Sequence, residues 1–418
     1  MRRKFAGRRT MWKLFRTPWF KLVCAAVLGI GCDHGYLGDD IQAEVASSDS
    51  RYGSVDNVDN VDGDRGVGSG NKMTFRKVAL SLSDEKSTAG IYDLAVGGNV
   101  VWASAYTFNK TTRDKGPMVV WEKVGSKDFA LATLPPTHAV HFPDVCAVSA
   151  EEAYVLALDG PDRKARLFAR KSGDKPLFEE QPAVEPSEGR YFSVMRLACF
   201  PGGNLWVYGS MQKGDDIGNK VHALFHRPST HEAWHAVPLP HDLPPPSWSS
   251  GVSLLLLRAD GSGYAGFSLG GEARIYERTQ DGIWEKVFAI GDEALQIASA
   301  VGDPSGRAVA IAQPKGNEGI ILSLEDAVWS TKIVPEASEF RATAQTPEGE
   351  LLIGGVRYSR SGGVVDAAEA VLVNSDLQRF PVPVRGRVHA MGFLSETGYV
   401  AINFTEKVED AGLYEVRF

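Results

Sequence analysis

The sequence IYDLAVGGNVVWASAY, residues 91–106, has the pattern of two β-strands joined by a tight turn. Apolar residues dominate positions 91–96 and 100–106, and Gly97, Gly98 and Asn99 between them are residue types typical of a hairpin turn. Two further apolar runs follow, MVVWEKV at 118–124 and FALATL at 129–134, before two prolines end the unit. This segment predicts four consecutive antiparallel strands.

The same order of strands and turns recurs at a spacing of about 45–50 residues, a length typical of a repeat architecture. Residues 196–208, RLACFPGGNLWVY, repeat the first hairpin and place Trp206 where the first unit has Trp102. Other copies of the unit's strands lie at 144–148, 153–158, 254–257, 263–267, 307–312 and 350–354.

Six complete units start near residues 87, 137, 187, 244, 293 and 338, and strands at 389–393, 398–404 and 412–418 form a seventh unit that lacks one strand. The strand at 75–82 belongs to no unit and is available to fill that place. Pairing the two ends of the chain leaves no gap in a ring of blades. We therefore predict an all-β fold, a β-propeller of seven four-stranded blades closed by an N-terminal strand, with six or eight blades as the alternatives.

A turn that ends in tryptophan repeats between the third and fourth strands, at residues 230–234, 280–284 and 325–329. These turns resemble degenerate Asp-box turns, in which an acidic residue caps the hairpin and the tryptophan packs between sheets. Sialidase-like propellers have such turns, and the resemblance implies a glycoside hydrolase-like enzyme as one alternative. The arginine motif expected at the start of those enzymes is missing, because Arg76 lacks the partner residues of that motif.

Residues 1–32 contain eight basic and no acidic residues, and an apolar run from Leu22 to Ile30 ends at Gly31 and Cys32. A basic segment before a short apolar run is typical of a secretory signal. The end of the run resembles a bacterial lipobox, although Gly29 stands where leucine is usual. The resemblance implies lipid attachment at Cys32. An ordinary signal peptide or an uncleaved anchor is the alternative.

Two features of the signal stay open. Arg8 and Arg9 resemble a twin-arginine export motif, but a general basic segment explains them equally simply, and a start at Met11 would remove them. Residues 33–72 are rich in Asp, Gly, Ser and Asn and contain few aromatic residues, which predicts a flexible acidic linker. Residues 73–418 then form the propeller domain.

Charge restricts the partners of the exported chain. The chain has 45 basic and 52 acidic residues, and eight of the basic residues lie in the signal, so that the mature chain carries a net charge of −15. Because nucleic-acid binding normally requires a basic surface, we expect no nucleic-acid partner.

No motif for catalysis or cofactor binding stands out, and we predict no catalytic residue, no cofactor and no metal. The inner strands contain mostly small or apolar residues. Histidines 222, 226, 231, 235 and 241 are close in sequence, but zinc needs three or four converging ligands, and this run is predicted on outer strands and a turn. Cys146 and Cys199 occupy non-equivalent positions of neighbouring units, which favours two buried thiols over a disulfide.

Three connections carry charged residues that would suit an active site, namely Asp159, Asp162 and Arg163, then Asp215 and Asp216, then Arg357, Arg360 and Asp366. We interpret them as solvated loop residues.

Together, the signal and the repeat pattern lead us to expect a cell-envelope lipoprotein, anchored in a membrane by Cys32, whose propeller binds a protein partner as a scaffold. A propeller that binds a glycan or small ligand, and a hydrolase, are the alternatives. A cluster of carboxylates with an arginine at the mouth of the central funnel would favour the enzyme, whereas a broad apolar patch on one face would favour the scaffold.

Overall fold

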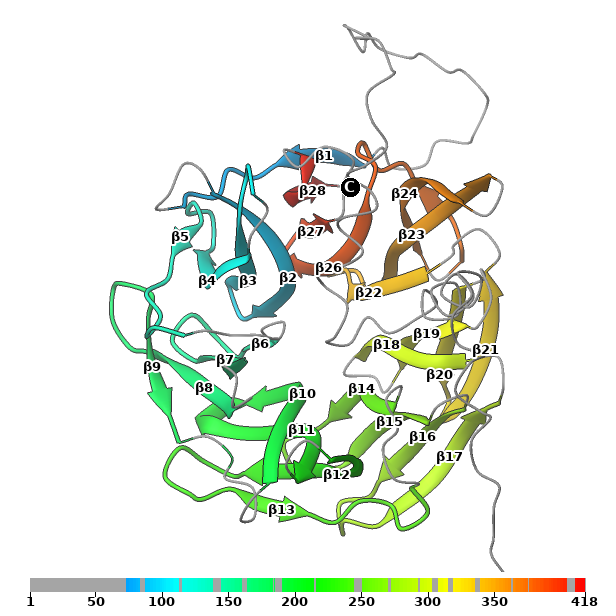
Figure 1. The fold of residues 1–418 in the computed structure, drawn as a ribbon. Helices are drawn as coiled ribbons and strands as arrows, with labels where there is room; N and C mark the ends of the chain where they lie inside the picture. The colour runs from blue at the N-terminus through cyan, green and yellow to red at the C-terminus, as the bar shows by residue number, and fades with distance from the viewer. Residues whose placement is uncertain are drawn as a thin grey trace, which may run out of the picture. The chain divides into compact units, whose positions relative to one another are not determined.

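The computed structural model describes residues 73–417, except 83–86, 113–114, 138–143, 160–163, 183, 185–189, 214–215, 244–249, 270–271, 292–293, 303–306, 315–318, 335–338, 362–363, 375 and 404–409. The export signal with Cys32 and the linker at 33–72 lie outside the described residues. Within these limits, 28 strands form seven antiparallel sheets of four strands each, arranged as blades in a ring (Figure 1). The predicted seven-bladed β-propeller is confirmed.

The first four blades follow the chain in order, and each runs from its innermost to its outermost strand. Blade 1 contains β2 (Ser87–Gly97), β3 (Val100–Asn109), β4 (Lys115–Val124) and β5 (Ala130–Leu131). Blade 2 contains β6 (Asp144–Ala147), β7 (Ala153–Asp159), β8 (Lys164–Lys171) and β9 (Leu177–Gln181). Blade 3 contains β10 (Arg190–Phe200), the 3₁₀ turn η1 (Pro201–Gly203), β11 (Asn204–Lys213), β12 (Asp216–Arg227) and β13 (His235–Val237). Blade 4 contains β14 (Ser250–Leu257), β15 (Gly263–Leu269), β16 (Ala273–Arg278) and β17 (Trp284–Ile290).

The last three blades complete the ring. Blade 5 contains β18 (Ala294–Gly302), β19 (Ala308–Pro314), β20 (Gly319–Glu325) and β21 (Val328–Val334). Blade 6 contains β22 (Glu339–Gln345), β23 (Leu351–Ser361), β24 (Val364–Asn374) and β25 (Arg379–Phe380). Blade 7 contains β26 (Arg387–Leu394), β27 (Thr397–Asn403), β28 (Gly412–Arg417) and β1 (Thr74–Lys77).

The N-terminal strand closes the ring, as the sequence predicted. β1 is the outermost strand of blade 7 and pairs antiparallel with β28, with Phe75 opposite Val416. The Arg76 side chain adds a 2.7 Å ion pair with Glu415 of β28. Because this blade combines both ends of the described chain, the first and last blades cannot separate without breaking a sheet.

Removing β1 should weaken the closure of the ring. A chain that begins at Ala79 lacks the four-residue ladder of β1, whereas a chain that begins at Lys72 retains it. Since a backbone hydrogen bond contributes about 1 kcal/mol net, we expect the shorter chain to lose about 2–4 kcal/mol of unfolding free energy. Chemical denaturation of the two chains measures this loss. Equal denaturation midpoints would show that β28 needs no partner.

The hydrophobic core lies between the faces of neighbouring blades. Between blades 1 and 2, for example, Trp102 of β3 packs edge to face with Phe178 of β9 at a ring-centroid distance of 5.3 Å. Similar clusters of fully buried side chains fill the other junctions. Both faces of the sheets are therefore covered, which explains why a strand such as β3 is buried along most of its length. In the described part of the chain, no helix is long and apolar enough to cross a membrane.

Candidate functional site

The innermost strands contain a repeated irregularity, which is followed by a polar side chain in three of the blades. In six of the seven blades, within the described residues, the first strand has a register shift against the second. An extra residue in one strand bends that strand and redirects the side chains that follow it. The first paired residue after the shift is Asp93 in blade 1, Arg196 in blade 3 and Ser299 in blade 5.

The side chains of Asp93 and Ser299, and that of Asp144 in blade 2, hydrogen-bond to the first strand of the next blade. Asp93 Oδ2 accepts the Val145 N–H at 2.8 Å, and Asp144 Oδ2 accepts the Leu197 N–H at 2.6 Å. Asp144 occupies the position in β6 that Asp93 occupies in β2. Each carboxylate therefore accepts a hydrogen bond from the residue that lies one position after the equivalent position in the neighbouring strand. Ser299 Oγ lies 3.1 Å from Thr343 Oγ1 with the same offset. The offset is therefore a repeated property of the ring.

Asp93 and Asp144 also hydrogen-bond to each other, and we call them the inter-blade carboxyl pair. Burial and the neighbouring Asp144 carboxylate raise the pKa of Asp93 well above its usual value. Burial also raises the pKa of Asp144, although the nearby Arg196 guanidinium opposes this shift. Two adjacent carboxylates in such a place share one proton. Asp93 is therefore the protonated partner, and Asp144 is the ionised one beside Arg196.

A second polar cluster links the inner strands of blades 6 and 7. Glu339 of β22 accepts hydrogen bonds from Arg341 Nε and, at 3.3 Å, from Tyr358 Oη of β23. Arg387 of β26 donates to Tyr358 Oη at 2.6 Å and lies 3.4 Å from Glu339 Oε2. Burial raises the pKa of Tyr358, so this hydroxyl stays protonated and donates to Glu339. This cluster too joins one blade to the next.

The expectation that the inner strands are small or apolar was therefore wrong in part. Two carboxylates and an arginine gather between the inner strands of blades 1 to 3, a combination that an active site could use. However, the oxygens of the inter-blade carboxyl pair accept backbone N–H groups that hold neighbouring blades together. Ser299 and Thr343 make the equivalent bridge at blades 5 and 6 without any carboxylate. The geometry assigns the pair a structural role in joining the blades.

Cys146 and Cys199 form a disulfide between the first strands of blades 2 and 3, with their Cα atoms 5.9 Å apart. The preference for two free thiols was wrong. It assumed that only equivalent positions of neighbouring blades meet, whereas the one-residue offset that joins Asp144 to Leu197 also brings Cys146 beside Cys199.

Two of the five histidines, His222 and His226, pack against aromatic side chains of blade 3. His226 stacks on Trp206 at 3.9 Å between ring centroids, and its Nε2 lies 3.1 Å from Asn204 Oδ1. Burial lowers the pKa of His226, which keeps the ring neutral near pH 7. His222 hydrogen-bonds to Tyr208, and His231, His235 and His241 are exposed. Among the residues that the structure describes, no group of three or more His, Cys, Asp or Glu side chains is arranged to hold a metal.

The tryptophan turns join outer strands of neighbouring blades. Trp234 Nε1 donates to the Pro182 carbonyl at 3.0 Å, and Trp284 Nε1 donates to the Pro238 carbonyl at 2.8 Å. In both cases the proline follows the last strand of the preceding blade. The prediction that these tryptophans pack between sheets is confirmed. In the turn before Trp284, the residue that caps the hairpin is a threonine instead of the expected acidic residue, because Thr279 Oγ1 accepts the Ile283 N–H.

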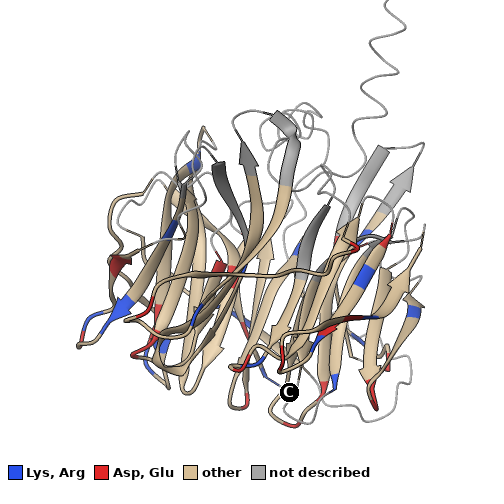
Figure 2. Cartoon of the chain, turned by 90° about the horizontal axis from the view of Figure 1, so that it is seen from below, with Lys and Arg blue, Asp and Glu red and all other residues tan. Residues whose placement is uncertain are grey.

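The structure describes few of the charged residues in the three connections that would suit an active site. The side chains of Asp159, Asp162, Arg163, Asp215, Asp216, Arg360 and Asp366 lie outside the described ones. Arg357 is described and exposed on β23. In the view of Figure 2, basic and acidic residues are interspersed along the described strands.

Fold and site together define a seven-bladed β-propeller closed by its N-terminal strand. The chain matches no protein-family model and no curated protein. Among solved structures it is similar to puromycin hydrolase, with 12% identity and a TM-score of 0.52 over 75% of this chain and 50% of that chain. The chain thus spans about half the length of puromycin hydrolase. The propeller domain of the Trilobed protease from Pyrococcus furiosus is 10% identical, with a TM-score of 0.48 over 78% of this chain and 95% of that chain. Likeness at this level of identity shows the fold alone.

Proposed function

We propose that the chain is an envelope lipoprotein whose propeller binds a protein partner as a scaffold or assembly module. Lipid on Cys32 holds it at a membrane, and residues 33–72 act as a flexible tether. The Cys146–Cys199 disulfide supports export, because disulfides persist in oxidising compartments such as the bacterial periplasm.

The exposed apolar side chains carry the protein-binding part of the proposal. Large apolar side chains that are exposed in the described part of the chain concentrate on two neighbouring blades. Four lie on β17, β21 and the turns before them, and one lies on β9, namely Ile283, Val287, Val328, Ile333 and Leu177. β17 and β21 are also the outermost strands of blades 4 and 5, so a partner can reach both the side chains and the strand edges. We call Ile283, Val287, Val328 and Ile333 the rim residues.

Crosslinked affinity purification from native membranes tests this role. We expect reproducible protein partners with the wild type, and loss of those partners in a Val328→Lys, Ile333→Lys double variant that stays in the membrane fraction. The matched control is Leu177→Lys, which places the same charge at an exposed apolar position of blade 2. If no partner is captured with the wild type, or if the double variant keeps its partners, the scaffold role is contradicted.

The anchor has its own prediction. Cys32→Ala removes the thiol that lipid attachment requires, so the protein should move from the membrane fraction to the soluble fraction. Cell fractionation with immunoblotting measures the shift, and mass spectrometry of the wild-type N-terminal peptide should find diacylglycerol on Cys32. A Cys32→Ala protein that stays in the membrane would instead support an uncleaved anchor.

A further inference from the structure

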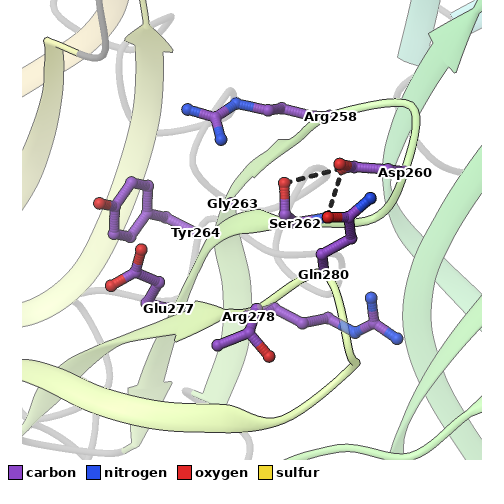
Figure 3. A pocket seen from close by; sticks show the side chains of 9 residues that line it. Arg258, Asp260, Ser262, Gly263, Tyr264, Glu277, Arg278 and Gln280 are labelled. Atoms are coloured by element: carbon purple, nitrogen blue, oxygen red, sulfur yellow. Dashed lines mark hydrogen bonds between the residues drawn. The ribbon is translucent and has the colours of Figure 1, made fainter.

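Blade 4 contains a polar pocket of about 350 Å³ that neither the ring closure nor the rim residues use. Two turns on the same side of the blade form it, the turn between β14 and β15 and the turn between β16 and β17 (Figure 3). Arg258, Tyr264 and Glu277 line one side, and Asp260 with Ser262 and Gln280 lines the other. Its volume lies at the lower end of the range of small-molecule sites, which is about 300–1,000 Å³.

The pocket is rigid without a ligand. Ser262 donates to Asp260 Oδ1 through both its backbone N–H, at 2.9 Å, and its hydroxyl, at 2.7 Å. Arg278 Nη1 donates to the Gly261 carbonyl at 2.9 Å and so joins the two turns. Gly261 has φ +81°, and a side chain there would collide with Trp206 of blade 3. Such preorganisation lowers the entropy that a ligand loses on binding.

The polar groups combine donors with acceptors and balance in charge. The lining contains two arginines, Arg258 and Arg278, and two carboxylates, Asp260 and Glu277, so it carries no net charge. Hydrogen bonds from Ser262 lower the pKa of Asp260, which keeps this carboxylate an acceptor. Burial raises the pKa of Tyr264, and the negative charge of the nearby Glu277 carboxylate adds to this shift. A strongly charged ligand gains little from a neutral lining, whereas each hydroxyl of a polyhydroxylated ligand can donate to a carboxylate and accept from a guanidinium.

An aromatic wall completes the pocket. Tyr264 packs edge to face against Trp329 of blade 5 at a centroid distance of 5.7 Å, which fixes the plane of its ring. The negative face of an aromatic ring attracts weakly positive C–H groups. A sugar ring presents C–H groups on one face and hydroxyls around its edge. We propose that this pocket binds a neutral saccharide, with Tyr264 against the sugar face and Arg258, Asp260 and Glu277 bound to its hydroxyls.

The proposal is independent of the protein-binding role, because the pocket and the rim residues share no side chain. The test uses the full chain in detergent on a glycan array, followed by calorimetric titration with the free monosaccharide of the best hit and with inorganic phosphate. We expect binding of a neutral sugar in the millimolar range, typical of a small polar site with few apolar contacts, and no binding of phosphate.

Two variants locate the site. Arg258→Ala and Glu277→Gln should each weaken sugar binding at least about tenfold, because each removes a charged hydrogen bond to a hydroxyl. Glu348→Gln makes the same chemical change in an exposed turn of blade 6 and should leave binding unchanged. Unchanged thermal unfolding shows that the variants fold. The proposal is overturned if no glycan binds, if phosphate binds in preference, or if both pocket variants bind the sugar as the wild type does.

Discussion

A Cys146→Ala, Cys199→Ala double variant should lose about 4 kcal/mol of unfolding free energy. The disulfide closes a loop with a sequence separation of 53 residues, which spans the whole of blade 2. In the chain-entropy model, a loop of this length stabilises the folded state by about 4 kcal/mol, because the cross-link restricts the unfolded chain. Alanine fits both positions without burying a new polar group.

Denaturant titration of the oxidised wild type and of the double variant measures this difference. A reducing agent should lower the midpoint of the wild type to that of the variant, and should leave the variant unchanged. If the wild type does not respond to reduction, and if both cysteines react with a thiol reagent in the folded protein, the disulfide is absent in solution.

The second large effect concerns the inter-blade carboxyl pair. Asp93→Ala removes the acceptor of the Val145 N–H and the hydrogen-bond partner of Asp144, and should cost about 2–4 kcal/mol, since it leaves buried polar groups unsatisfied. Asp93→Asn should behave differently. The amide oxygen can accept the Val145 N–H while the amide nitrogen donates to Asp144, as the protonated carboxyl does.

The two proteins should respond differently to pH. The pKa of Asp93 is raised by folding, so the folded state holds its proton at pH values where the unfolded chain has released it. The resulting stabilisation is complete below the usual aspartate pKa and is lost as the pH rises through the raised value. Asparagine cannot lose this proton. The stability of Asp93→Asn relative to the wild type should therefore increase as the pH rises above about 4.

Urea denaturation of both proteins between pH 4 and pH 8 gives this difference directly, because titrations common to both proteins cancel. Ser299→Ala is a matched control, since it breaks an uncharged bridge between blades 5 and 6 and should cause a loss of stability that does not vary with pH. A constant difference between Asp93→Asn and the wild type across this range would contradict the shared proton.

Much of the fold was readable from local pattern. The hairpin at 91–106 and its copy at 196–208 gave the blade, and the count of copies gave seven blades. The start of each predicted unit lies within about seven residues of the first strand observed in that blade. The unassigned strand at 75–82 led to the ring closure that β1 makes.

The polar inner strands could not be read in the same way. Strict alternation assigns each residue of a strand to one face, but a β-bulge shifts that assignment for all residues after it. Asp93, Asp144 and Arg196 are far apart in sequence and look like isolated charges within apolar runs. A signal was present, because Asp93 and Asp144 occupy equivalent positions of the repeat, and a repeated buried carboxylate indicates a repeated bond.

The sequence by itself determined the class of fold, the number of blades and the strand that closes the ring, because strand alternation and turn chemistry are local properties that repeat. Only the tertiary structure decided which side chains meet across the blades. The one-residue offset between neighbouring inner strands pairs Cys146 with Cys199 and places Asp93 beside Asp144. That offset arises from the packing of one twisted sheet against the next, a relation between separate segments that neither segment's sequence encodes alone.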